Sequence, residues 1–471
     1  MKWEGAIPKN HIVEVGRLID ESPLSSFQMR ILGICFLLSM IEGFDTQAIA
    51  FVGPALAKQW ALTPPMFGPI FSIGLFGAVV GGMAVGMIQD IIGRRPTLMM
   101  AIFAFSALTF ITSLAGSYEQ LLIIRLLTGI GLGAAVPIIF SYAAEYSPAR
   151  VRITMVALIV AGFPVGAVLG GIIASAIIGQ YGWHAIFWIG GIVPLILIPT
   201  VWMFMPETIR FLAIRPENRD KIIAIFKRIN PGVDLTPDTT FLLDEVKVTG
   251  ARFPALFMKK LLPGTILLPI ALFSSLLLTY CLINWLPILL TQFGFSVEQA
   301  LYGPVFYNLS SIVGSLCLTR LIDRIGKPLL VLGVAYIIGC IGVASIGLVG
   351  RSFPAVMGMI FVAGLFVVGP QLSLMAFITN FYPTAIRGTG IGWGQGMGRV
   401  GSLTGPLLGG YLLSLHVDTP ILLQIVSVSA LASSAALFIL MFFFKEASLA
   451  ATEGRSEPAQ VDKVLRHDVS A

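Results

Sequence analysis

Two acidic residues interrupt the first long apolar stretch of the chain. Glu42 and Asp45 lie about halfway along it, in the sequence SMIEGFDTQA at residues 39–48. A charge at bilayer depth costs roughly 2.5 kcal/mol or more, so such residues favour a functional role. Three residues apart on a helix, the two carboxyls are expected to share one face. Because like charges in a low dielectric do not both ionise readily, we expect one carboxyl to hold a proton near neutral pH, which suits proton uptake and release.

Arg125 is the first of two arginines expected inside apolar spans. It begins the sequence RLLTGIGLGAAVP at residues 125–137, at a depth similar to that of Asp45. A guanidinium stays charged in proteins and binds carboxylates through two parallel hydrogen bonds. Two roles are therefore open. Arg125 either pairs with Asp45 or holds the carboxylate of a bound molecule, and these roles can alternate.

Arg399 is expected near the middle of an apolar span in the second half of the chain. That half offers it no acidic neighbour, since Asp418 falls beyond the end of the span. A buried arginine without a compensating charge favours an anionic ligand. We therefore predict that Arg399 binds the carboxylate of a transported molecule. The alternative is a structural role, with the guanidinium satisfied by backbone carbonyls or by the other half of the chain.

Four polar or aromatic side chains in the apolar spans are further candidates for contact with a ligand. Tyr280 and Asn284 are four residues apart and so share a helical face. Gln47 follows the two acids, and Trp393 precedes the second arginine in its span. Each of these residue types more often packs or forms hydrogen bonds between helices, so that alternative stays open.

The composition is that of a membrane protein. Of the 471 residues, 56% are hydrophobic and only 11% are charged. A soluble globular protein does not need this much apolar surface. The net charge of +6 does not indicate nucleic-acid binding, and all four cysteines fall in apolar segments. The sequence shows no disulfide framework, metal-ligand spacing, nucleotide-binding loop or nucleophile triad, so we expect neither a metal or cofactor nor enzyme activity.

Twelve apolar spans of about 20 residues, the length that crosses roughly 30 Å of hydrocarbon, position these residues. They fall at 30–52, 66–88, 97–115, 120–142, 153–178, 184–205, 264–290, 298–320, 328–348, 353–378, 388–414 and 419–444. The predicted fold is an all-α polytopic membrane protein. Its expected parts are an N-terminal segment, a six-helix bundle, a central loop, a second six-helix bundle and a C-terminal tail, at 1–29, 30–205, 206–263, 264–444 and 445–471.

Lysine and arginine set the expected orientation. Of the 30 such residues, all but Lys58, Arg125, Arg351 and Arg399 fall in the tails, the central loop or the loops after spans 2, 4, 8 and 10. Cytoplasmic loops carry the excess of these residues. We therefore expect a multi-pass protein of a plasma membrane, such as the bacterial inner membrane, with both termini in the cytoplasm. We also expect it to be monomeric.

The two halves of the chain repeat the same features. DIIGRR (90–95) and PARVR (148–152) in the first half correspond to DRIGKP (323–328) and PTAIR (383–387) in the second. Spans 5 and 11 carry glycines at the same spacing: Gly162, Gly166, Gly170 and Gly171, and Gly401, Gly405, Gly409 and Gly410. The repeat predicts two bundles related by an axis along the membrane normal, with the solute site between them near the midplane. The glycine rows are expected to let helix backbones approach closely.

Charged residues at the span ends are candidates for gating. In the loop after span 2, a carboxylate and cations lie close to helix ends, where they meet the helix dipoles, and span 8 repeats the pattern. Such a cluster can hold two helices together and release them as the bundles move. The alternative is an ordinary positively charged cytoplasmic loop. The predicted gating residues are Asp90, Arg94, Arg95, Glu145, Arg152, Asp323, Arg324 and Arg387.

With twelve spans, a duplicated D-x-x-G loop and a six-plus-six division, the chain resembles the major facilitator superfamily over essentially its whole length. Within it, EGFD at 42–45 resembles the DGFD signature of the aromatic acid:proton symporter family. Further similar stretches are RLLTGIGLGAA (125–135), EYSP (145–148), WLP (285–287), YPTAIRGTGIGW (382–393) and GR (398–399). The chain departs from the family pattern at Glu42, where Asp is usual, at Gln89, where a small residue is usual, and at Ile91, where a basic residue is usual.

The resemblance implies import of benzoate-, hydroxybenzoate- or phenylpropionate-like acids together with protons, as in the catabolism of aromatic compounds. Positions matching the family motifs would serve proton coupling, anion handling and conformational cycling: Glu42 and Asp45, Arg125 and Arg399, and Glu145 and Arg387, respectively. Phenylpropionate-type members look similar at Gln47, which would face the substrate.

We therefore predict a proton-coupled symporter for a small carboxylate, whose partners are the organic acid, protons and the lipid bilayer. One alternative is a proton-driven exporter of drugs or metabolites with the same fold, against which Arg399 counts. Another is a transceptor or chemosensor for aromatic acids. The segment from Lys445 is too short for a signalling domain, so this reading would require a separate partner.

Overall fold

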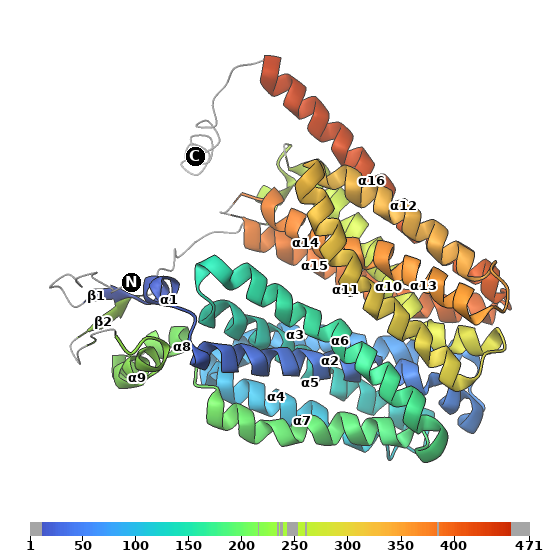
Figure 1. Ribbon diagram of the computed structural model, residues 1–471, viewed down its shortest axis with the longest axis horizontal. Helices are drawn as coiled ribbons and strands as arrows, with labels where there is room; N and C mark the ends of the chain where they lie inside the picture. Colours follow the sequence, from blue (N-terminus) through green and yellow to red (C-terminus); the bar gives the residue numbers. More distant parts are fainter. Residues whose placement is uncertain are drawn as a thin grey trace.

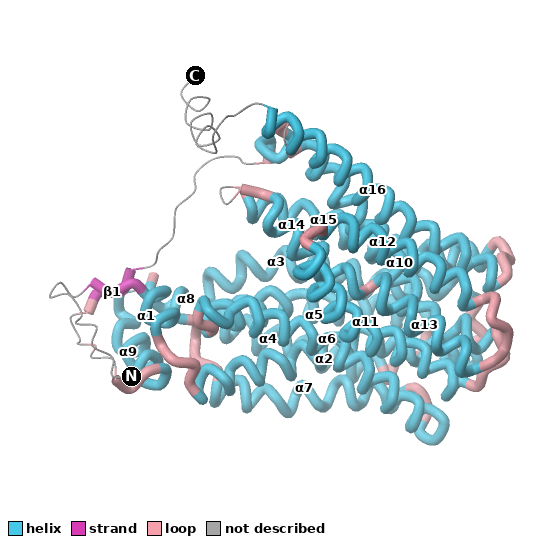
Figure 2. Tube along the Cα trace, turned by 45° about the horizontal axis from the view of Figure 1, so that its top comes forward, coloured by secondary structure: helices cyan, strands magenta, loops and turns pink. Residues whose placement is uncertain are grey.

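The computed structural model describes residues 12–214, 216–232, 235, 239–242, 253–259, 261–383 and 386–453, and these are almost entirely helical (Figures 1 and 2). The long helices of the first half are α2 (Ser26–Trp60), α3 (Pro64–Ile92), α4 (Arg94–Thr112), α5 (Tyr118–Tyr146), α6 (Ala149–Tyr181) and α7 (His184–Phe204). Those of the second half are α10 (Leu262–Gln292), α11 (Val297–Ile325), α12 (Pro328–Ile346), α13 (Phe353–Val367), α14 (Gly369–Phe381), α15 (Arg387–Ser414) and α16 (Thr419–Glu453).

In the described part of the chain, 11 helical spans are long and apolar enough to cross a membrane, with α13 and α14 together forming one span. The all-α polytopic prediction is confirmed, and the span predicted at 388–414 is present as α15, which is less apolar than the other eleven. Helix α15 has 28 residues, which is long enough, yet it carries Gln395, Arg399 and a row of glycines and does not reach the same apolarity. This helix borders a polar cavity, described below, which explains why its sequence is less apolar.

The starts of several helices follow from local sequence. Ser25 and Gln28 form a capping box at the start of α2, and Ser296 and Gln299 form the same arrangement at the start of α11. Each box satisfies two backbone N–H groups that the start of the helix would otherwise leave without an acceptor. Proline occupies one of the first two positions of α3, α10, α12, α13 and α14, where a missing N–H costs nothing.

The two halves form two groups of helices that lie side by side (Figure 1). We call the end at which α1 (Val15–Glu21), α8 (Ile209–Ala213) and α9 (Arg219–Ile229) lie the α9 end, and the opposite end the far end. The two groups converge at the far end and diverge toward the α9 end (Figure 1).

Glycines bring helix backbones together within each half, as predicted. A Cβ added at Gly166 of α6 would overlap the backbone carbonyl of Met40 in α2. A Cβ added at Gly405 of α15 would overlap the carbonyl of Leu277 in α10. The helix pairs α2–α6 and α10–α15 therefore pack through corresponding glycine rows, as small-residue interfaces in membranes do.

Contacts between the halves close the far end. Ser72 in α3 donates its hydroxyl hydrogen to the carbonyl of Leu403 in α15, at 2.9 Å. The ring of Trp285 in α10 packs edge-on against Phe67 and Phe71 in α3, with centroids 6.4 and 5.4 Å apart. Burial of these three aromatic side chains seals the interface on that side.

The polar region between the halves is folded rather than a plain loop. Strand β1 (Ile12–Glu14) pairs in parallel with β2 (Thr240–Leu242). Two short 3-10 helices, η1 (Pro216–Asn218) and η2 (Pro254–Phe257), precede α9 and α10, respectively. Helix α9 is amphipathic, with its apolar side buried together with α1 in the core of the first half. The buried residues of α9 are Ile222, Ile223, Ile225, Phe226 and Ile229.

Candidate functional site

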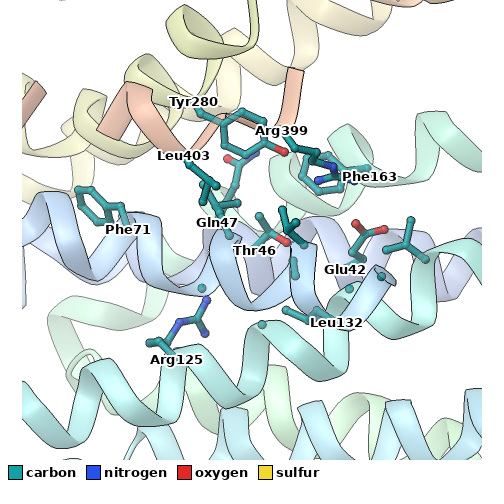
Figure 3. Close-up of a pocket in the computed structure, with 18 of the residues that line it drawn as sticks. Glu42, Thr46, Gln47, Phe71, Arg125, Leu132, Phe163, Tyr280, Arg399 and Leu403 are labelled. Atoms are coloured by element: carbon teal, nitrogen blue, oxygen red, sulfur yellow. The ribbon is translucent and has the colours of Figure 1, made fainter. Parts of the chain in front are cut away.

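A cavity of about 580 Å³ lies between the two halves, within the range of about 300–1,000 Å³ that suits small-molecule sites. Helices α2, α3, α5 and α6 supply one wall, and α10 and α15 supply the other (Figure 3). Its polar lining consists of Glu42, Thr46, Gln47, Arg125, Tyr280, Asn284, Gln395 and Arg399. The cavity extends toward the α9 end, where Met83 and Gly392 are among its lining residues. Since the far end is closed by interhelical contacts, the cavity has access from one side only.

Glu42 and Arg399 belong to opposite walls of this cavity. Glu42 projects from α2 and Arg399 from α15, with Phe163 beside the guanidinium (Figure 3). The two charges interact electrostatically across the cavity. Among the described residues, neither takes part in an ion pair within 4.0 Å, and the Arg399 side chain remains exposed. Arg399 is therefore open to an anionic ligand while a proton-accepting carboxyl faces it.

Asp45 and Arg125 form an ion pair inside the first half. The distance from Asp45 Oδ2 to Arg125 Nη1 is 3.6 Å, and both side chains are buried. Thr109 in α4 donates its hydroxyl to Asp45 Oδ1 at 2.7 Å, and the guanidinium lies 6.0 Å from the ring centroid of Phe187. In this state Arg125 is paired with Asp45, the first of the two roles expected for it. Arg125 also lines the cavity, so its second predicted role stays open.

The expectation that the two acids share one face is corrected by the structure. Glu42 lines the cavity, whereas Asp45 is 0% exposed and faces α4 and α5. Residues three apart on a helix differ in direction by about 60°. On α2 this difference is enough for Glu42 to face the cavity while Asp45 faces the interior of the first half. Each carboxyl consequently has its own cationic neighbour, Arg399 for Glu42 and Arg125 for Asp45.

Gln47 lines the cavity, but its amide is already engaged. It exchanges hydrogen bonds with Asn308 of α11, in the other half, at 3.1 and 3.0 Å. Asn308 also donates to the carbonyl of Pro304 in its own helix, at 2.8 Å. In this state Gln47 therefore joins the halves, and its predicted contact with substrate requires that bridge to open.

Tyr280 and Asn284 both line the cavity from α10, as their shared helical face suggests. Asn284 donates to the carbonyl of Tyr280 at 2.7 Å. The structure places the third candidate of this half, Trp393, elsewhere. Its indole N–H donates to the carbonyl of Thr265 at 2.9 Å, and its ring packs against Phe253 and Phe257 near η2. Trp393 is outside the cavity because it lies on the face of α15 that is turned toward α10 and η2, so the structure does not favour direct contact with a substrate.

The predicted gating charges of the first half are bound to one another. Arg94 forms an ion pair with Glu145 of α5. Glu207, just after α7, accepts hydrogen bonds from the backbone N–H groups of Arg94 at 3.0 Å and Arg95 at 3.2 Å, at the start of α4. Burial raises the pKa of the Glu207 carboxyl, although these N–H groups act in the opposite direction. The cluster ties α4 to α5 and to the end of α7, a location where a carboxylate also meets the helix dipole favourably.

Arg152 and Arg387 occupy matching positions in the two halves and make matching contacts. The Nε of Arg152 donates to the carbonyl of Ser147 at 3.1 Å, and that of Arg387 donates to the carbonyl of Tyr382 at 3.4 Å. Each acceptor lies five residues earlier in the chain. Arg152 also pairs with Asp20 of α1 at 2.7 Å. The sequence repeat thus extends to local side-chain geometry.

The remaining gating candidates are less engaged. Asp90 interacts electrostatically with Arg94. In the described part of the chain, Asp323 and Arg324 are exposed and form no ion pair. Among the residues that the structure describes, the ion pairs near the α9 end all lie within the first half. In this state, therefore, the predicted gating charges hold the helices of one half together and do not join the two halves.

Several contributing residues were not among the predicted site residues. Thr46, Phe163 and Gln395 line the cavity, while Thr109 and Glu207 hold charged groups in place. The sequence carried a signal for Gln395, a polar residue within an apolar span, and for Glu207, a carboxylate at the end of one. A search of the described residues finds no group of three or more His, Cys, Asp or Glu placed to hold a metal ion.

The helical fold, the cavity between two halves and the ionisable side chains on its walls define a polytopic membrane transporter, not an enzyme. Residues 35–371 match the Major Facilitator Superfamily, and the chain belongs to this family. It is a secondary transporter of that fold and a multi-pass membrane protein.

Comparisons with individual proteins agree with this assignment. The chain is 34% identical over 432 residues to the gallate transporter of Pseudomonas putida, covering 91% of this chain and 95% of that protein. It is 34% identical over 429 residues to the 4-hydroxybenzoate transporter PcaK of Acinetobacter baylyi, covering 90% of this chain and 93% of that protein. The crystal structure of a D-xylose–proton symporter superposes with a TM-score of 0.67 at 16% identity, covering 88% of this chain and 97% of that one.

Proposed function

We propose that this protein imports a small aromatic carboxylate together with at least one proton. The observation that carries the proposal is the relation between Arg399 and Glu42. An accessible guanidinium without a close ion-pair partner faces an ionisable carboxyl across a cavity of suitable size. Arg399 would hold the substrate carboxylate, and the apolar lining, which includes Phe71 and Phe163, would accept the ring.

Proton coupling follows from the charges in the cavity. When a substrate carboxylate binds Arg399, a second carboxylate at Glu42 would stand close to it in a low dielectric. Two such anions do not both remain ionised readily, so Glu42 takes up a proton as the substrate binds. An anion and a proton then move together, which removes the penalty of roughly 2.3 kcal/mol per charge per 100 mV against an interior-negative potential.

Asp45 and Arg125 would contribute a second proton step. A proton on Asp45 weakens its ion pair and frees the Arg125 guanidinium, which lines the same cavity. If this site carries its proton with Glu42, two protons accompany one anion and the cycle is electrogenic. The ion pair would reform after the proton leaves.

The orientation proposed for the cycle rests on the distribution of basic residues. The α9 end would face the cytoplasm of a bacterium, because it carries the lysines and arginines of the tails and the central region. The cavity is closed at the far end and extends toward the α9 end, so the conformation would be the one that releases substrate inward. The names of the two relatives, transporters of gallate and of 4-hydroxybenzoate, support an aromatic acid as the cargo.

The test is uptake of radiolabelled carboxylates by proteoliposomes, with an inward acid gradient and with an uncoupler in a parallel sample. We expect an aromatic acid to accumulate and the accumulation to collapse with the uncoupler. If no acid enters but preloaded compounds leave under the same gradient, the protein is an exporter and the proposal is wrong.

A further inference from the structure

A second, smaller cavity of about 240 Å³ adjoins the main one. The two share the side chains of Glu42, Phe163, Tyr280 and Arg399, so the smaller cavity is a side lobe that begins at the proposed carboxylate site. Helices α2, α5 and α6 of one half and α10, α11, α14 and α15 of the other enclose it. We call this side lobe the hydroxyl lobe because of its lining.

The lining of the hydroxyl lobe differs from that of the main cavity in its polar groups. Its hydroxyl and amide side chains, apart from the shared residues, are Ser39, Thr279, Asn308, Ser311, Ser315 and Gln371. Apolar residues such as Phe140 and Ile312 complete the wall. Among the described residues that line it, Arg399 is the only cation, and it lies at the mouth that the lobe shares with the main cavity. The interior of the lobe therefore suits a ring with neutral polar substituents and does not suit a second anionic group.

Ser39 is the polar group in the lobe that most needs a partner. Its side chain is 1% exposed, and in the part of the chain that the structure describes its Oγ has no hydrogen-bond partner. A buried hydroxyl without a partner is unfavourable because it has lost its hydrogen bonds to water. A ligand hydroxyl in the lobe would supply the missing hydrogen bond after a small movement of α2 or α6 that exposes Oγ, because this atom has almost no accessible surface in the present state.

The serines of α11 are set up to accept hydrogen bonds from a ligand. Ser311 donates its hydroxyl hydrogen to the carbonyl of Asn308 at 2.7 Å, and Ser315 donates to Ile312 at 2.9 Å. With their hydrogens used in this way, the oxygens of both serines retain lone pairs that can only accept. A phenolic O–H is a donor, and so is the natural complement of these oxygens.

We propose that the hydroxyl lobe is the subsite for ring hydroxyl groups of the substrate. This inference rests on the proposed function and narrows it to hydroxylated aromatic acids. The carboxylate is held by Arg399 at the mouth, and the ring extends into the lobe with its hydroxyls toward Ser39 and Ser311. Since the lobe is enclosed by both halves, a ligand seated there contacts both.

The experiment compares uptake of benzoate, 4-hydroxybenzoate and 3,4,5-trihydroxybenzoate by proteoliposomes containing the full-length protein. The variants are Ser39→Ala and Ser311→Ala. Ser310→Ala is the matched control, because Ser310 is the neighbour of Ser311 and likewise donates to a carbonyl of its own helix, that of Tyr307 at 2.9 Å, but it does not line the lobe. The quantity measured is the ratio of kcat/KM for the hydroxylated acids to that for benzoate.

We expect the wild-type protein to prefer a hydroxylated acid. Each lobe variant should lower the ratio roughly three- to tenfold, as expected for one lost hydrogen bond. Ser310→Ala should leave the ratio at its wild-type value. If Ser39→Ala does not fold, Ser311→Ala and the near-isosteric Thr279→Val test the same lobe.

Three results would overturn the inference, and they identify different failures. An unchanged ratio in active lobe variants would mean that Ser39 serves only the close packing of α2 on Gly162 of α6, its nearest neighbour there. A wild-type protein that takes up benzoate without discrimination would remove the subsite but leave aromatic acid transport intact. If the wild-type protein transports no aromatic acid, both the subsite and the proposed function are wrong.

Discussion

Gln47 and Asn308 exchange two hydrogen bonds across the interface between the halves of the molecule. The Nε2 of Gln47 donates to Asn308 Oδ1 at 3.1 Å, and the Nδ2 of Asn308 donates to Gln47 Oε1 at 3.0 Å. The side chains are 0% and 4% exposed. This paired amide bridge joins α2 to α11 at the wall of the cavity, so we expect a movement that separates these two helices at the far end to break it.

Removing the bridge should shift the protein toward a state that is open at the far end. We expect Gln47→Ala or Asn308→Ala to raise the rate of maleimide labelling at Val305→Cys, a buried interface position, roughly three- to tenfold. The background should carry Cys317→Ser, since Cys317 is exposed. The exchanged pair, Gln47→Asn with Asn308→Gln, should recover slow labelling. Equal labelling rates in all variants would show that the bridge does not hold the far end closed.

Arg399 should govern affinity for the substrate carboxylate. Loss of a charged hydrogen-bond donor typically costs about 1.5–3 kcal/mol, so Arg399→Ala should weaken binding roughly 10- to 100-fold. Arg399→Lys retains the charge but not the bidentate geometry, and should recover only part of the affinity. Arg351→Ala, at an exposed arginine beyond α12, is the control. The measurement is KM for uptake, and an unchanged KM in Arg399→Ala would exclude Arg399 as the carboxylate site.

Glu42 should couple transport to the proton gradient. We expect Glu42→Gln to abolish accumulation driven by an acid gradient but to retain exchange of labelled for unlabelled substrate, because the neutral side chain mimics the protonated form permanently. Glu298→Gln, at an exposed glutamate in the first turn of α11, should behave as wild type. Gradient-driven accumulation by Glu42→Gln at the wild-type level would contradict this role.

Asp45 should differ from Glu42 in its effect on stability. Asp45→Asn leaves the Arg125 guanidinium buried without its counter-charge, a change that typically costs about 3–5 kcal/mol. The thermal unfolding temperature in detergent should therefore fall for Asp45→Asn and stay near wild type for Glu42→Gln. Acid-driven uptake should be lost in Asp45→Asn as well. Partial recovery of stability by the double variant with Arg125→Gln would identify the unpaired cation as the cause.

Glu207 should make the stability of the first half depend on pH. Burial raises the pKa of this carboxyl above its ordinary value of 4.5, so the folded protein holds a proton there that the unfolded chain has released. Stability from this group should consequently fall as the pH rises from about 4.5 through the raised pKa. Unfolding temperatures measured across this range should show a smaller decline in Glu207→Gln than in wild type. A decline of equal slope in both proteins would place the dependence on another group.

Much of the fold could be predicted from local sequence because a bilayer imposes simple requirements on length and apolarity. The glycine rows of α6 and α15 marked close helix contacts for an equally local reason, since only glycine lets two backbones approach so closely. The span predicted at 388–414 matches α15 although its polar cavity wall lowers its apolarity. The same reasoning was less successful for the region of α8 and α9, whose amphipathic pattern falls in a segment that looks like a loop.

The sequence by itself determined that ionisable groups lie at membrane depth, on which helices they lie, and that a second half repeats the first. Only the tertiary structure decided their partners: Asp45 with Arg125, Glu42 opposite Arg399, and Gln47 with Asn308. The tertiary structure also decided that Trp393 lies outside the cavity and that Ser39 lines its side lobe. The direction in which a side chain points depends on the rotation of its helix, and this rotation is fixed by packing against helices distant in the chain, which no local pattern records.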